Sequence, residues 1–256
     1  MPGPELDVLA AARRATGTGA PGVAAAFFDL DNTMIRGASL FLLARSLHAR
    51  RFFTSRELRF WARRALSYAV HGENLRHVGE VRRLGLAFVA GHEVAEIRAI
   101  GEELYDEHVA ARVWPGTQAL ARGHRDRGEP VWLVTAAPVE VADVVARRLG
   151  LTGAVGTVAE SVRGRYTGRL VGEPVHGAAK AEAVRVLARA EGLDLARCAA
   201  YSDSAHDLPL LSLVGRPVVV NPDRALRAHA RAHGWPVHEF RRSRRAGRLA
   251  ARAALV

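Results

Sequence analysis

The chain has 256 residues, 49% of them hydrophobic, which is enough for a sizeable core in one large domain or in a domain with an insertion. No apolar run reaches the roughly 18 residues of a membrane span, and residues 1–21 do not have the pattern of a secretory signal. The single cysteine, Cys198, excludes internal disulfides and fits a reducing cytoplasm. Of the formal net charge of +11, six arginines in residues 241–256 supply +6, so the charge lies largely in a tail and predicts no nucleic-acid-binding domain.

The first predicted strand carries the most informative motif. Residues 1–21 are rich in Ala, Gly and Pro and are expected to be a loose lead-in, and an apolar run then leads from Gly22 to Asp29 and Asp31. Open α/β sheets bind ligands beyond the carboxyl ends of their strands, and strand residues two apart face the same way. Both carboxylates are therefore expected in one crevice, where a divalent cation would relieve their repulsion. An ordinary surface turn is the alternative.

Residues 39–112 are predicted to form about four helices without a strand. Apolar residues recur at helical spacing, Gly72 and Gly91 supply breaks, and Ser39 and Ser55 are candidate N-caps. The recurring positions are Leu40, Leu43 and Leu47; Leu58, Trp61 and Leu66; Leu75, Val78 and Val81; and Ile97, Ile100, Leu104 and Val109. This block would lie as a cap over the carboxyl end of the first strand, where it could exclude water and select substrates.

Strands and helices then alternate, which predicts an α/β fold with a parallel sheet. Strands are expected at 130–135, 154–158, 198–202 and 216–221, and helices at 117–127, 139–149 and 177–190. The alternation over residues 158–171, interrupted by Arg163-Gly164, predicts a β-hairpin.

Polar residues end these strands, and one lysine begins a helix between them. The strands end at Asp29 and Asp31, at Thr135 and at Asp203, so in a parallel sheet these side chains converge on one edge. Of 37 basic residues, Lys180 is the only lysine. Lys and Arg differ in function mainly at tight sites, so the single lysine indicates a need for a compact ammonium beside a phosphate or carboxylate. The alternative is that this lysine was kept by chance.

Two acids lie four residues apart after the strand at 198–202. Asp203 could complete a site of hard oxygen ligands, and Asp207 could orient that site or hold Lys180. Stabilisation of a helix N-terminus is the ordinary role, and it suits Asp207 better than Asp203. His206, between them, is expected on the solvent side, because no second His or Cys lies at metal-binding spacing.

In order, these motifs resemble those of the haloacid-dehalogenase-like (HAD) phosphatases. The matching residues are Asp29-Leu-Asp31-Asn-Thr33, Thr135, Lys180 and Asp203-Ser-Ala-His-Asp207. The helical insertion resembles the cap of the phosphoserine-phosphatase-like branch, subfamily IB, and the resemblance spans residues 23–236. It implies a Rossmann-like parallel core at 22–38 and 113–240, a helical cap domain at 39–112 and a basic tail at 241–256.

The resemblance also implies roles for the motif residues. Asp29 would be the nucleophile that forms an aspartyl-phosphate, and Asp31 would shuttle the proton. Mg²⁺ would be held by Asp29, a backbone carbonyl at Asp31 and Asp203. Thr135 and Lys180 would contact the phosphoryl group. Asp207 would support Lys180 or the metal from outside the ligand set.

Two departures from the family pattern bear on the substrate. Ala38 stands where phosphoserine phosphatases usually carry a Glu that receives the substrate amino group, and Thr135-Ala136-Ala137 stands where they show Ser-Gly-Gly. The expected enzyme is therefore a cytoplasmic, Mg²⁺-dependent phosphatase for a small phosphorylated metabolite, with no cofactor besides the metal. The alternatives are phosphoserine phosphatase proper, a phosphotransferase, and a membrane- or nucleic-acid-associated binding protein that uses the basic tail and keeps vestigial chemistry.

Overall fold

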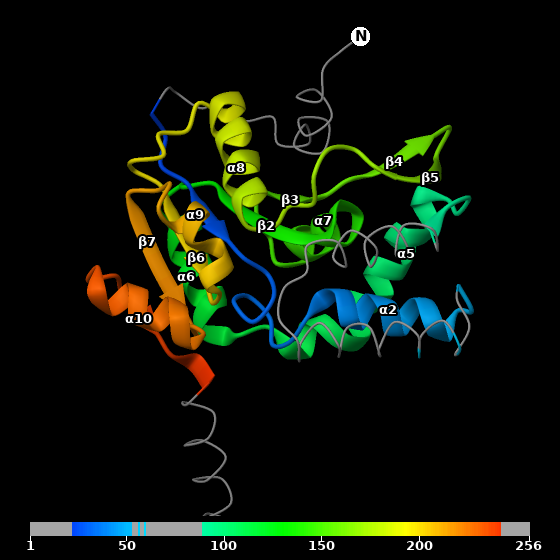
Figure 1. Ribbon diagram of the computed structural model, residues 1–256, viewed down its shortest axis with the longest axis horizontal. Coiled ribbons are helices and arrows are strands. Elements are labelled where there is room, and N and C mark those ends of the chain that lie inside the picture. The colour runs from blue at the N-terminus through cyan, green and yellow to red at the C-terminus, as the bar shows by residue number, and fades with distance from the viewer. Residues whose placement is uncertain (1–21, 53–55, 57–58, 60–88, 242–256) are drawn as a thin grey trace, which may run out of the picture.

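The computed structural model describes residues 22–52, 56, 59 and 89–241. In this part of the chain the centre is a six-stranded, wholly parallel sheet with the order β3-β2-β1-β6-β7-β8 (Figure 1). Its strands are β1 (Ala26–Phe28), β2 (Val131–Pro138), β3 (Gly153–Thr157), β6 (Ala199–Ser202), β7 (Arg216–Val220) and β8 (Val237–His238). The α/β class and the parallel sheet predicted from the alternation of elements are confirmed.

The strand order defines a crevice between β1 and β6. From β1 the sheet grows through β2 to β3, and from β6 it grows in the opposite direction through β7 to β8. In open α/β sheets, ligands bind beyond the carboxyl ends of the strands at such a reversal. Asp29 directly follows β1 and Asp203 directly follows β6, so the topology alone brings both acids to this crevice.

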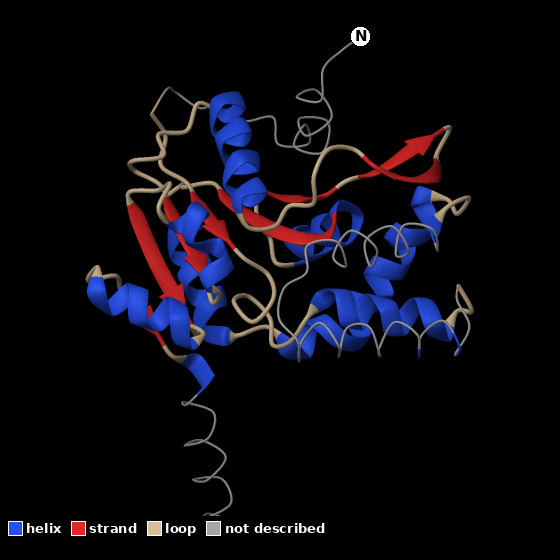
Figure 2. Cartoon of the chain, viewed as in Figure 1, coloured by secondary structure: helices blue, strands red, loops and turns tan. Residues whose placement is uncertain are grey.

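Helices cover both faces of the sheet, as Figure 2 shows. On one face, α8 (Ala178–Glu191), α9 (Leu208–Leu211) and α10 (Arg224–Ala232) pack over a buried cluster that includes Phe27. On the other, α6 (Pro115–Asp126) and α7 (Val139–Arg148) pack over a cluster that includes Phe28. Because side chains alternate along a strand, Asp29 shares the face of Phe27, which is the face that α8 covers.

The elements that the structure describes in the insertion after β1 are helices joined by turns. It comprises α2 (Ser39–Ala49), α5 (Val94–Leu104), a π-helical turn (Tyr105–Val109) and a 3₁₀ turn (Ala110–Arg112). The helices expected around residues 58–81 and the candidate cap Ser55 lie outside the described residues. The prediction that Ser39 caps α2 is wrong: Ala38 has the extended conformation of the N-cap, and Ser39 is already helical.

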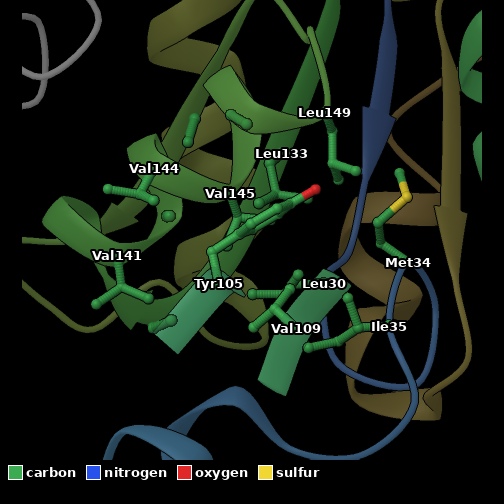
Figure 3. Close-up of a cluster of buried hydrophobic side chains, with 14 of the residues drawn as sticks. Leu30, Met34, Ile35, Tyr105, Val109, Leu133, Val141, Val144, Val145 and Leu149 are labelled. Carbon is green, nitrogen blue, oxygen red and sulfur yellow. The ribbon is translucent and has the colours of Figure 1, made fainter. Parts of the chain in front are cut away.

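The segment that leads from α5 back to the sheet is anchored on α7. Tyr105 and Val109 are buried, and Figure 3 shows both in one apolar cluster with Val145 of α7. At the rim of this contact the Arg148 guanidinium lies 4.6 Å from the centre of the Tyr105 ring and pairs with Asp106. The end of the insertion is therefore fixed to the sheet by apolar packing and by charge.

The remaining elements agree with the sequence except near the end of the described chain. The predicted hairpin forms from β4 (Ala159–Val162) and β5 (Arg165–Leu170), and Arg165 pairs with Glu93 at the start of α5. The edge strand β8 and the helix α10 were not expected, because β8 is only two residues long and gives no alternating pattern. Among the helices that the structure describes, none has the length and apolarity needed to cross a membrane.

Candidate active site

Three charged side chains meet just beyond the carboxyl end of β1. Lys180 Nζ lies 2.7 Å from Asp29 Oδ1 and 2.8 Å from Asp207 Oδ2. The exposed fractions are 7% for Asp29, 3% for Lys180 and 2% for Asp207. Burying a charge is unfavourable unless it is paired. Separating any of these three side chains would leave a buried charge unpaired, so the two ion pairs hold the group together. The convergence of these residues predicted from the sequence is what the structure shows.

The ion pairs set the protonation states of the group. Burial raises the pKa of Asp29 to about 6, although the nearby Lys180 ammonium pulls it down. Burial alone would lower the pKa of Lys180, but the charges of Asp29 and Asp207 outweigh it and raise the pKa. At neutral pH, Lys180 is therefore an ammonium and Asp29 a carboxylate. An electron-rich oxygen beside a fixed cation suits attack on an electrophile whose oxygens are anionic.

Asp207 holds the lysine in place. Its Oδ2 accepts a 2.7 Å hydrogen bond from Ser202 Oγ as well as the 2.8 Å bond from Lys180 Nζ. Ser202 is the last residue of β6, so the position of the ammonium is coupled to the central sheet. Of the two roles that the sequence left open for Asp207, the geometry fits the support of Lys180.

Asp31 is held by the first turn of α2. Its Oδ1 accepts a 2.8 Å hydrogen bond from Ser39 N, so the amide at the helix start orients the carboxylate. Asn32 takes a left-handed conformation at φ 58°, and its Oδ1 accepts a bond from Gly37 N. Burial raises the pKa of Asp31, and its charge in turn helps to raise the pKa of Asp29. The two acids therefore share one environment, as predicted, although Asp31 lies in a turn and not in the strand.

Asp203 lies on the other side of the crevice. It accepts a long hydrogen bond of 3.5 Å from Thr33 Oγ1, and its Oδ2 is 3.8 Å from the guanidinium of Arg241. The pKa of Asp203 is raised to about 7, mainly by burial and also by the negative charge of Asp29. Two desolvated carboxylates with this mutual repulsion form an environment that a divalent cation would stabilise.

The carboxylates are not a complete metal site by themselves. Within the described part of the chain, no three side chains of His, Cys, Asp or Glu gather closely enough to hold a metal ion. A hard cation such as Mg²⁺ usually takes one or two carboxylates and keeps several waters. Asp29 and Asp203, completed by a backbone oxygen and water, fit that pattern.

Thr135 lies in β2, the strand beside β1, near the edge of the sheet that carries Asp29. β1 and β2 are parallel neighbours with Phe28 opposite Leu133, so Thr135 extends two residues past that level on β2. The side chain is 1% exposed, and its Oγ1 accepts a 3.2 Å bond from Ala137 N. With its oxygen used as the acceptor, the hydroxyl keeps its proton for a second hydrogen bond.

Asn221 is a site residue whose role the sequence did not reveal. It is fully buried at the end of β7, at φ 48°, and its Nδ2 donates to the carbonyl of Asn32 at 3.3 Å. Its Oδ1 accepts from the amides of Phe240 at 2.8 Å and Arg241 at 3.2 Å. It therefore ties the turn that carries Asp31 to the end of the described chain. Its place at a strand end was visible in the sequence, but its three partners were not.

Comparisons with known proteins agree with this geometry. The family model of haloacid dehalogenase-like hydrolases matches residues 26–212. Phosphoserine phosphatase SerB1 of Mycobacterium tuberculosis is 53% identical over 233 residues, which are 91% of this chain and 76% of that protein. Histidinol-phosphatase of Neisseria meningitidis serogroup C is 29% identical over 84% of this chain and 98% of its own length.

A solved structure is also similar over most of the chain. The crystal structure of a protein with unknown function from Bordetella pertussis Tohama I superposes with a TM-score of 0.77 at 30% identity. The match covers 86% of this chain and 99% of that one. The similarity thus extends over most of the chain.

Proposed function

The chain belongs to the haloacid dehalogenase-like hydrolases, in their phosphoserine-phosphatase-like branch, and from this premise we propose that it is a Mg²⁺-dependent phosphatase that cleaves a small phosphomonoester through an aspartyl-phosphate. The observation that carries the proposal is the buried contact of Lys180 with Asp29 and Asp207, across the crevice from Asp203. A structural ion pair would need neither the adjacent, partly neutralised acids nor their place at the switch point of the sheet.

Asp29 is the nucleophile in this proposal. One of its carboxylate oxygens attacks the phosphorus atom, the bond between phosphorus and the substrate oxygen breaks, and the alcohol leaves. Lys180, held by Asp207, balances the charge of the phosphoryl oxygens, and the Thr135 hydroxyl donates a hydrogen bond to them. The desolvation that raises the pKa of Asp29 also leaves its oxygen poorly hydrated and ready to attack.

Asp31 moves the proton. Burial raises its pKa above the ordinary value, and in its protonated form the carboxyl gives its proton to the departing alkoxide. The resulting carboxylate then takes a proton from the water that attacks the phosphorus atom of the aspartyl-phosphate, which frees inorganic phosphate and restores Asp29. The bond from Ser39 N holds the carboxylate in place for both steps.

Asp29, Asp203 and the backbone carbonyl of Asp31 would hold Mg²⁺. The bound ion would supply positive charge to the phosphoryl oxygens and would reduce the repulsion between the two carboxylates. Both ligand side chains are hard oxygen donors of the kind that Mg²⁺ prefers. We also propose a cytoplasmic location, which the single, buried Cys198 supports.

The substrate is a small phosphorylated metabolite, with phosphoserine as the second candidate. The SerB1 relative is named for phosphoserine, and the more distant one for histidinol phosphate. Ala38, beside the turn that carries Asp31, has no charge with which to bind a substrate ammonium group. Phosphoserine is therefore one of several phosphorylated metabolites to be tested as the substrate.

A metabolite screen tests the proposal. The purified chain is given 4-nitrophenyl phosphate, L-phosphoserine, histidinol phosphate and other phosphorylated metabolites, with Mg²⁺ or with EDTA. We expect phosphate release only with Mg²⁺, and loss of at least about 1,000-fold in Asp29→Asn with an unchanged circular dichroism spectrum. Failure to hydrolyse any monoester with Mg²⁺ would favour the alternative of a binding protein with vestigial chemistry.

A further inference from the structure

Two histidines from different segments meet beside the buried ion pairs. His176 precedes α8, and His206 lies in the short 3₁₀ turn Ala205–Asp207. Their ring centres are 5.3 Å apart and the ring planes cross at 71°. The backbones approach closely as well, because a Cβ atom on Gly177 would lie 3.8 Å from the carbonyl oxygen of His206. Both histidines are exposed, so the pair forms a small surface of two imidazoles.

This surface adjoins the catalytic group directly. His206 is the residue before Asp207, and His176 lies four residues before Lys180. The 2.8 Å contact between Lys180 and Asp207 joins the two segments that carry the imidazoles. Partial burial of the ring lowers the pKa of His176, and the charges of His206 and Lys180 lower it further against an opposing effect of Asp207. The pair is thus within electrostatic reach of the residues that would act on the phosphoryl group.

The charges around the pair favour an anion. Asp207 is already used by Lys180 and Ser202, so its charge is largely balanced. Two imidazoles side by side repel each other when protonated, and an anion bound beside both of them reduces that cost. The 14-residue helix α8 also directs its N-terminus here, with Gly177 as an N-cap that has no side chain. These three features act in the same direction.

The position of the pair shows which anion it would meet. Asp29 and Lys180 are almost fully buried, whereas both imidazoles are exposed. A phosphoryl group bound at Asp29 would therefore lie deeper than the imidazoles, and a substrate that extends to the surface on the side of Lys180 would reach them. We infer that His176 and His206 bind a second anionic group of the substrate, a carboxylate or a further phosphate, and so select doubly anionic phosphomonoesters. The inference rests on the proposed function.

Two aryl phosphates that differ in one charge test the inference. The compounds are 4-carboxyphenyl phosphate and 4-carbamoylphenyl phosphate, which are nearly equal in shape. The measured quantity is the ratio of their kcat/KM values in the wild type, His176→Gln and His206→Gln. We expect either variant to lower the ratio of carboxylate to amide substrate about tenfold, the loss of one charge-assisted hydrogen bond, while kcat/KM for the amide changes less than about threefold.

His233→Gln is the matched control, because His233 is an exposed histidine at the end of α10. It should keep the wild-type ratio. An unchanged ratio in both site variants, or an equal loss for both compounds, would overturn the inference. If the wild type hydrolyses neither compound, the metabolite screen decides the proposed function separately. Calorimetric titration with the same two compounds then decides: a selective loss of affinity for the carboxylate in the variants supports the histidine site, and equal affinities reject it.

Discussion

Lys180 is the residue whose chemical identity matters most. Its Nζ bridges two carboxylate oxygens at 2.7 and 2.8 Å with only 3% of the residue exposed. A guanidinium is wider than an ammonium and presents its donors in a fixed plane, so it cannot take both bonds in the same space. This agrees with the argument from composition, in which a chain that uses arginine at 36 other positions keeps one lysine.

We therefore predict that Lys180→Arg is severely impaired although it keeps the charge. The expected loss in kcat for 4-nitrophenyl phosphate is about 100-fold or more, since misplacement of a catalytic group by about 1 Å has that effect. Thermal unfolding and circular dichroism establish whether the variant folds. A folded Lys180→Arg enzyme with nearly wild-type kcat would show that a compact ammonium is not needed.

The raised pKa values of Asp29 and Asp203 link stability to pH and metal. Their folded-state values of about 6 and 7 exceed the ordinary value of 3.8. Their favourable contribution to folding is therefore present at low pH and is lost as pH rises through about 6 and 7. Since Mg²⁺ binds only the ionised carboxylates, it should restore that stability where protons no longer can.

We predict a larger Mg²⁺-induced rise in melting temperature at pH 8 than at pH 5.5. At about 100 times the dissociation constant the rise at pH 8 should be about 5 °C, and it should be small at pH 5.5. Differential scanning fluorimetry measures both. Asp203→Asn is the control and should respond little at either pH. An equal rise at both values of pH would mean that these carboxylates do not hold the ion.

At the scale of elements, β1 and β6 are also joined on the face away from Lys180. The Phe28 and Tyr201 rings stack at 4.1 Å, and Asp29 N donates to the Tyr201 carbonyl at 2.9 Å. The Tyr201 hydroxyl lies 2.7 Å from Nε2 of His124 in α6, and the other ring nitrogen of His124 contacts Glu129. This buried network supports the backbone from which Asp29 projects.

Removing one member of the network should affect stability more than chemistry. Tyr201→Phe leaves the buried Nε2 of His124 without its hydroxyl partner, which should lower the free energy of unfolding by about 1–3 kcal/mol. Urea denaturation measures the change, and kcat for 4-nitrophenyl phosphate should remain within about threefold of the wild type. An unchanged free energy of unfolding would show that the hydrogen bond between Tyr201 and His124 makes no net contribution to stability.

The elements that the sequence predicted are those with strong local patterns. The strand at Ala26–Phe28, the hairpin and α8 follow from apolar runs, a turn and helical spacing, and the strand ends carry the predicted acids. The bonds that complete the site were out of reach, because they join distant residues: Asn221 with Asn32, and Ser39 with Asp31. The motifs therefore predicted that Lys180 lies beside Asp29. The hydrogen bonds that hold the surrounding turn in place could be seen only in the tertiary structure.

At the scale of the whole molecule, Arg241 is the boundary between the candidate active site and the arginine-rich residues 242–256. Arg241 N bonds to Asn221 Oδ1 and its guanidinium lies 3.8 Å from Asp203, so this residue belongs to the surroundings of the site. Residues 242–256 carry five further arginines and no acidic residue. A cut after Arg241 thus separates the basic tail from the contacts that the structure describes.

We predict that deleting residues 242–256 leaves kcat/KM for 4-nitrophenyl phosphate within about twofold of the full chain. The contacts that the structure describes at the site reach Arg241, so this deletion removes none of them. The measurement is made at about 0.15 M ionic strength, with deletion of 241–256 as the comparison that also removes Arg241. A tenfold or larger loss on removal of 242–256 would make the tail part of the catalytic apparatus.

The central claim is that this fold assembles its charged residues so that Asp29 attacks phosphorus. Rapid acid quenching of the full chain during turnover of a ³²P-labelled monoester, followed by peptide mapping, tests it most directly. The account predicts acid-stable, base-labile label on the peptide that contains Asp29, and none in Asp29→Asn. Steady hydrolysis with no protein-bound label at any quench time, or with label on a different residue, would contradict it.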